Sequence, residues 1–263
     1  MNGGGVFARR LCRLLPPYIV WSLAYSLLLS RSGVLGAIKE LLTAGAAAHV
    51  YFIAVYLQLT LITPLLYRLL RRFPLFAYAI TPLSLVAYEV LTVAGVVLPF
   101  LGRLFPMWLI FYVVGLDWER WSAHLQGRTH AAIFALCVCL TVQLAAGFMW
   151  GWFGDYNMAT SQLKLSSMAT SLCVIAVIML LPAAVKRRLS ESFLADLGDV
   201  SFGVYLCHIL VLAVMRKVIS LFVLPPLLGT VLIFPLTLGL SWSLCVIVHR
   251  ALSRKFARVL GMA

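Results

Sequence analysis

The sequence has few charged residues, and acidic ones are especially scarce. Only 11% of its 263 residues are charged, Asp and Glu number eight in total, and 63% of the residues are hydrophobic. A soluble domain usually carries about 25% charged and 45–50% apolar residues, so this composition excludes a soluble globular protein. It indicates an all-α, polytopic membrane helix bundle. Every connection between the apolar runs is short, which also excludes an inserted soluble domain.

Cysteine pairs of the metal-binding or redox type are also lacking. Six cysteines are present, but none forms a C-x-x-C pair, and all except Cys12 lie inside apolar runs. The usual sequence patterns of a zinc site and of a disulfide framework are therefore excluded. We expect the cysteines to pack as small apolar side chains, and we expect no metal and no bound cofactor.

The net charge is +13, which in a soluble protein would suggest a nucleic-acid partner. In a membrane protein it has another explanation, because cytoplasmic loops collect Lys and Arg. We therefore assign the charge to topology and expect no nucleic-acid partner.

Apolar runs long enough to cross about 30 Å of hydrocarbon determine the expected number of helices. Seven runs qualify: 14–30, 48–67, 74–98, 131–150, 167–185, 200–220 and 227–248. A shorter run at 104–116 becomes an eighth span if its flanking aromatic residues lie in the interfaces. With eight spans and a cytoplasmic N-terminus, fifteen Lys and Arg fall on the inner side and six on the outer side. The positive-inside rule thus favours about eight transmembrane helices with both termini in the cytoplasm.

A cationic cluster precedes the first apolar run. An arginine at the centre of a membrane helix costs about 2.5–3.5 kcal/mol, so Arg9, Arg10 and Arg13 should stay at an aqueous surface. Arg10 and Arg13 are three residues apart and share one helix face, so their guanidinium groups could bind one anion together. The alternative is that both serve only as a topology anchor.

Polar side chains inside the apolar runs are the other candidates for a functional site. His49 lies at the outer end of the second run, and Glu89 is the only carboxylate far from a predicted membrane surface. Ser201, Tyr205 and His208 follow at i, i+4 and i+7, which aligns them on one helix face. As functional residues, these five would line a chamber for the substrate or an acyl donor. The alternative is that His49 is an ordinary interfacial histidine and that Glu89 is hydrogen-bonded to a neighbouring helix. The three polar residues of 201–208 would then form a structural hydrogen-bond network.

Four short motifs follow one another along the chain. They are Phe-x-x-Arg-x-x-Arg-x-x-Pro over 7–16, His-x-Tyr-Phe-Ile over 49–53 with Thr-Pro-Leu-Leu over 63–66, Phe-Tyr-Val-Val-Gly over 111–115, and Ser-Phe-Gly-x-Tyr-Leu-x-His over 201–208. In this order, on a multi-span chain, they resemble the acyltransferase-3 family of bacterial integral-membrane O-acyltransferases. That family includes enzymes that acetylate or succinylate cell-envelope polysaccharides. The resemblance spans nearly the whole chain.

The resemblance implies a membrane-bound acyltransferase in the bacterial inner membrane. It would transfer an acyl group, such as acetyl, from acyl-CoA to a hydroxyl of a cell-surface polysaccharide or its lipid-linked precursor. Arg10 and Arg13 match the family's Arg-x-x-Arg, which implies that they bind the acyl donor. The implied partners are acyl-CoA, the sugar acceptor and the lipid bilayer. Two other functions stay open: an export protein for polysaccharide or lipid-linked sugar, and a catalytically inactive partner that binds sugars.

The chain departs from the family at its first residues. In the family, a first helix carries an arginine and a histidine that are regarded as catalytic, whereas this chain starts with MNGGG directly before the Arg-x-x-Arg. We therefore expect residues 1–263 to form a single acyltransferase-like domain without those first helices, and we assign no catalytic residue. Such a chain would be inactive alone if a misplaced start or a truncated gene removed the helices, or if a separate chain supplies them.

Overall fold

The computed structural model describes residues 3–30, 33–47, 49–96, 98, 100–222 and 225–262, and these residues form helices and turns without a strand. Seven segments among them are long and apolar enough to cross a membrane. This confirms the predicted all-α, polytopic fold. The segments are formed by α1 (Gly3–Leu28), α3 (Tyr51–Arg72), α4 (Pro74–Val93), α7 (Thr129–Trp152), α8 (Tyr156–Thr160) together with α9 (Leu165–Met179), α12 (Ser201–Ile219) and α13 (Pro226–Ala251).

Shorter elements connect these segments. Each has fewer than ten residues, less than the hydrocarbon core requires of a helix. They are α2 (Val34–Leu42), the 3₁₀ turns η1 (Leu101–Arg103) and η2 (Phe105–Met107), α5 (Leu109–Leu116), α6 (Trp118–Leu125), α10 (Ala183–Ser190), α11 (Phe193–Asp199) and α14 (Arg254–Val259).

The run 104–116, predicted as an eighth span, forms η2 and the eight-residue helix α5. Eight helical residues extend only about 12 Å, so α5 cannot cross the hydrocarbon core. The Oγ1 atom of Thr81 donates to the carbonyl oxygen of Pro106 at 2.8 Å and accepts from the amide of Ile110 at 2.9 Å. Irregular backbone is tolerated at membrane depth where protein surrounds it, and Val113 of α5 is fully buried. The segment therefore packs against α4 and is not one continuous spanning helix, so the number of crossings and the orientation of the termini stay predictions.

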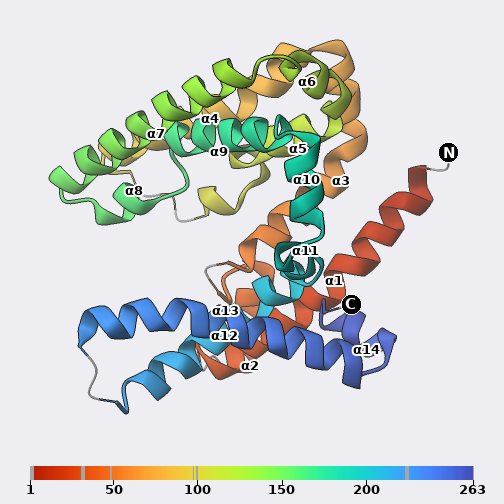
Figure 1. Ribbon diagram of the computed structural model, residues 1–263, viewed down its shortest axis with the longest axis vertical. Coiled ribbons are helices and arrows are strands. Elements are labelled where there is room, and N and C mark those ends of the chain that lie inside the picture. The colour runs from red at the N-terminus through yellow and green to blue at the C-terminus, as the bar shows by residue number, and fades with distance from the viewer. Residues whose placement is uncertain are drawn as a thin grey trace. The chain divides into compact units, whose positions relative to one another are not determined.

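The chain forms two compact units, which we describe separately. The first unit comprises residues 1–60 and 187–263, and the second comprises residues 61–186. In the first unit α12 and α13 run alongside each other, and α14 packs beside α1 (Figure 1). In the second unit α7 packs against α9, and α4 packs against α5.

Three aromatic side chains of α1 hold the first unit together. The Tyr18 hydroxyl donates to the carbonyl of Leu41 at the end of α2, at 2.5 Å. The Trp21 Nε1 donates to the carbonyl of Leu260, after α14, at 3.0 Å, and the Tyr25 hydroxyl donates to the carbonyl of Leu206 in α12 at 2.5 Å. The rings are buried while their polar atoms are paired, which suits Tyr and Trp in an apolar interior. The first helix of the chain is thus bonded to three other segments.

Gly261 is required where the C-terminal segment packs against α12. Its φ is +70°, and a Cβ atom there would lie 2.5 Å from Cδ1 of the fully buried Leu206. We expect Gly261→Ala to lower the free energy of unfolding by about 1–3 kcal/mol, because it adds backbone strain and a steric clash. Thermal unfolding in detergent measures the change.

The matched control for this substitution is Gly239→Ala, because nothing lies within 4 Å of a Cβ atom at Gly239 of α13. Alanine is also the better helix former, so this variant should unfold at or above the wild-type temperature. Equal unfolding temperatures of the Gly261 and Gly239 variants would contradict the tight packing of the C-terminal segment.

Candidate active site

The ring of His49 lies at the centre of a group of aromatic side chains in the first unit. His49 is in the turn that precedes α3. Its ring centroid lies 5.1 Å from that of Tyr25 in α1, and 5.2 Å and 4.9 Å from those of Tyr205 and His208 in α12. All three are edge contacts. We call these four residues the histidine cluster.

Tyr205 links the two histidines by hydrogen bonds. Its hydroxyl donates to the backbone carbonyl of His49 and so joins α12 to the turn before α3. The Nδ1 of His208 lies 2.7 Å from the carbonyl oxygen of Tyr205. A carbonyl can only accept, so Nδ1 of His208 carries the hydrogen, and in the neutral ring Nε2 keeps its lone pair. His208 therefore presents a basic nitrogen that this hydrogen bond does not occupy.

The electrostatics of His49 keep its ring neutral. Burial lowers the pKa of His49 to about 4, and the neighbouring His208 adds a smaller lowering effect. The backbone of Leu206 raises the pKa, but by less. Both ring nitrogens are buried, and neither has a hydrogen-bond partner of good geometry among the described residues. Leaving a buried polar group unpaired costs about 1–3 kcal/mol, so the ring is suited to binding a polar ligand group. A hydroxyl or a carbonyl would provide such a partner.

The structure brings three of the five predicted chamber residues together, namely His49, Tyr205 and His208. Ser201 is exposed at the first residue of α12, seven positions before His208, and is not among the contacts of the cluster. Seven residues correspond to about 10 Å along a helix, so sharing a face does not bring these two side chains together.

Glu89 lies in the second unit and pairs with the start of another helix. Its Oε1 accepts a hydrogen bond from the amide of Leu165, the first residue of α9, at 2.7 Å. The first amides of a helix have no partner within the helix, and negative charge is favourable there. The neighbouring Lys164 donates from Nζ to the carbonyl of Ala159 at 2.6 Å. This geometry favours a structural role for Glu89.

A polar face of α1 was missed by the sequence analysis. Tyr18, Ser22, Tyr25 and Ser26 are all buried, and the hydroxyl groups of the two serines have no partner among the described residues. Their positions follow i, i+4, i+7 and i+8, the spacing of one helix face. That pattern is visible in the first apolar run, and it identifies the side of α1 that carries Tyr25 into the histidine cluster.

Arg13 lines a pocket of about 450 Å³ in the first unit, with walls from α1, α12 and the C-terminal segment. Its side chain is exposed. Arg10 lies one turn earlier in α1, but its side chain is outside the part of the chain that the structure describes. The other residues of the pocket are Cys12, Pro16, Phe202, Arg258, Val259 and Gly261.

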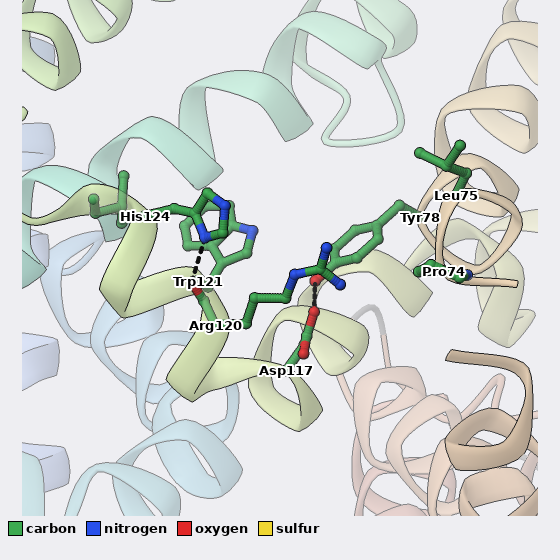
Figure 2. Close-up of a pocket in the computed structure, with 8 residues that line it drawn as sticks. Pro74, Leu75, Tyr78, Asp117, Arg120, Trp121 and His124 are labelled. Carbon is green, nitrogen blue, oxygen red and sulfur yellow. Dashed lines mark hydrogen bonds between the residues drawn. The ribbon is translucent and has the colours of Figure 1, made fainter. Parts of the chain in front are cut away.

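A pocket of about 430 Å³ in the second unit lies between the start of α4 and helix α6 (Figure 2). The hydroxyl of Tyr78 donates to a carboxylate oxygen of Asp117 at 2.9 Å, and Nδ1 of His124 lies 2.8 Å from the carbonyl oxygen of Arg120. Figure 2 shows the Arg120 side chain extending towards the ring of Tyr78. Because its acid is already paired, we place the candidate active site at the histidine cluster instead.

These features define a polytopic membrane protein with two histidines and two tyrosines gathered among its helices, a site suited to proton transfer. The model of the acyltransferase-3 family, described as an acyltransferase domain, matches residues 2–246. The chain belongs to this family, which confirms the predicted resemblance and supports membrane acyltransferase activity. Comparisons with curated proteins and with solved structures found no match.

The lowered pKa of His49 predicts a pH-dependent stability. The unfolded chain takes up a proton near pH 6.5, whereas the folded protein does so only near pH 4, so unfolding binds a proton between these values. The free energy of unfolding should have its full value above pH 6.5. It should fall by up to about 3 kcal/mol as the pH is lowered towards 4. Unfolding temperatures in detergent from pH 4 to 7.5 measure the effect.

The variant His49→Gln removes this titration and leaves the other groups in place. Its unfolding temperature should fall less steeply over the same pH range. Identical slopes for the variant and the wild type would show that His49 is not buried as a neutral ring.

Proposed function

We propose that this protein is a membrane-bound O-acyltransferase of the bacterial inner membrane. It transfers an acyl group, acetyl in the first instance, from acyl-CoA to a hydroxyl of a cell-surface polysaccharide or of its lipid-linked precursor. The observation that carries the proposal is the histidine cluster in a chain of the acyltransferase-3 family, because His49 and His208 lie 4.9 Å apart between ring centroids.

In this proposal, Nε2 of His208 acts as the general base. It takes the proton of the acceptor hydroxyl while that oxygen attacks the thioester carbonyl, and the tetrahedral intermediate then releases the thiolate of coenzyme A, which is protonated to the thiol. A histidine suits this step because its ordinary pKa lies near the working pH. The hydrogen bond from Nδ1 to the Tyr205 carbonyl orients the ring for it.

The neutral ring of His49 has a different role in the proposal. One of its nitrogens is a donor and the other an acceptor, and neither has a partner of good geometry among the described residues. We assign His49 to hydrogen bonding with the acceptor hydroxyl or with the negative charge that develops on the carbonyl oxygen. Such a donor is most effective in a site from which water is excluded.

The arginines of α1 bind the donor in this proposal. The phosphates of acyl-CoA are anions, and guanidinium groups bind phosphate oxygens through two parallel hydrogen bonds. Arg13 lines a pocket that is open to such a ligand, and Arg10 lies one turn away on the same helix. In this proposal, the acyl group reaches the histidine cluster from there on the flexible pantetheine arm of coenzyme A.

We expect His208→Gln to reduce acyl transfer by about 10²- to 10⁴-fold, because it removes the proposed base. Membranes that contain the variant are incubated with labelled acetyl-CoA, and label in the envelope glycan is measured. The matched control is His130→Gln, since His130 is exposed at the start of α7. Transfer by the His208 variant within threefold of the control would refute the assignment.

Replacement of both Arg10 and Arg13 by alanine should abolish the use of the acyl donor. Transfer should be lost at acetyl-CoA concentrations that saturate the wild type, because donor binding is what the change removes. The control is Arg71→Ala with Arg72→Ala, a cationic pair exposed at the end of α3. Unchanged transfer in the first double variant would exclude these arginines from the donor site.

A further inference from the structure

The last residues of the chain are an integral part of the first unit. Helix α14 and the turn after it lie beyond residues 2–246, the part that matches the family. The Leu260 carbonyl accepts a hydrogen bond from Trp21, Gly261 lies against Leu206 and Phe202, and Met262 is only 4% exposed. This C-terminal segment is therefore packed into the core and can form part of a site.

The C-terminal segment contributes a second cation to the pocket of Arg13. Arg258 of α14 lines this pocket of about 450 Å³ together with Arg13 of α1. Both side chains are exposed. None of the eight acidic residues of the chain lines the pocket, and no carboxylate is paired with either arginine among the described residues. Two positive charges from separate helices thus share one pocket without a counter-charge from the residues that the structure describes.

The residues that line the pocket define the chemistry of its ligand. Two guanidinium groups can bind several anionic oxygens at once, which suits a phosphate ester or a diphosphate better than a single carboxylate. Phe202 and Pro16 add apolar wall. A volume of about 450 Å³ lies in the ordinary range of small-molecule pockets, but it is too small for all of a coenzyme A molecule. The pocket fits the phosphate-bearing part of a larger ligand.

We infer that the C-terminal segment completes a phosphate-binding pocket in which Arg258 and Arg13 bind the phosphate groups of one ligand. This inference rests on the proposed function in one respect: it takes the phosphates to be those of acyl-CoA. A phospholipid headgroup offers the same chemistry, so the experiment must separate the two sources. Arg258 is thereby assigned a binding role from a segment outside the family match.

The thiol of Cys12 provides a direct measure of occupancy. Cys12 is exposed and lines the same pocket, so a bound ligand should slow its reaction with a maleimide. The protein is reconstituted in phosphatidylcholine nanodiscs, and the Cys12 peptide is quantified by mass spectrometry. The probes are a thioether analogue of acetyl-CoA, which has no free thiol, inorganic pyrophosphate, and nanodiscs that also contain phosphatidylglycerol.

We expect the acetyl-CoA analogue to protect Cys12 in the wild type. Arg258→Ala should raise the half-protecting concentration at least tenfold, and Arg258→Lys should raise it less because the charge is kept. Arg254→Ala is the matched control, because Arg254 is exposed on the same helix but does not line the pocket. Its half-protecting concentration should stay within twofold of wild type, and both alanine variants should unfold at the same temperature.

The outcomes separate the inference from the proposed function. If the acetyl-CoA analogue protects Cys12 in the Arg258→Ala variant as well as in the control, but not in Arg13→Ala, the inference is overturned. The donor role of Arg13 then stands. If phosphatidylglycerol protects Cys12 and the acetyl-CoA analogue does not, the phosphate pocket stands and the donor site proposed there is wrong. Absence of protection by every probe would overturn the inference as well.

Discussion

The first unit depends on hydrogen bonds that buried aromatic side chains donate to backbone carbonyls of distant segments. In hydrocarbon an unpaired polar group costs several kcal/mol, so a tyrosine or tryptophan turned inwards must find its partner within the protein. Tyr25 donates to the carbonyl of Leu206, Trp21 donates to that of Leu260, and Tyr205 donates to that of His49. Each bond is directional, so each admits one register of the paired segments. The positions of the two histidines follow from this set of bonds.

Tyr205 has a double role in that arrangement. Its hydroxyl holds the turn that carries His49, and its carbonyl selects the hydrogen position on the ring of His208. One residue therefore positions one histidine and orients the other. The burial that makes these bonds favourable also keeps His49 neutral, so the forces that assemble the unit prepare its polar site. In the second unit, the paired acids Glu89 and Asp117 bond a helix amide and a tyrosine hydroxyl.

Much of the fold could be predicted from the sequence, because a bilayer imposes a minimum length and an apolar composition on every helix that crosses it. The run 104–116 could not be predicted in this way, since the bonds of Thr81 to Pro106 and Ile110 decide its conformation. Helical spacing related Tyr205 to His208, but it could not place His49 beside them, because that contact joins segments 156 residues apart. The sequence did not relate Arg258 to Arg13, because the two residues come to line one pocket only when α14 packs beside α1.

The hydrogen bond between Trp21 and Leu260 joins residues 239 positions apart and has a consequence for biosynthesis. The first helix therefore leaves the ribosome long before Leu260, its packing partner 239 positions later, has been translated. Residues 61–186 are complete well before that moment. The inward face of α1 must therefore be accommodated in the translocon, in lipid or by a chaperone until Leu260 has been made, so the first unit is completed later than residues 61–186.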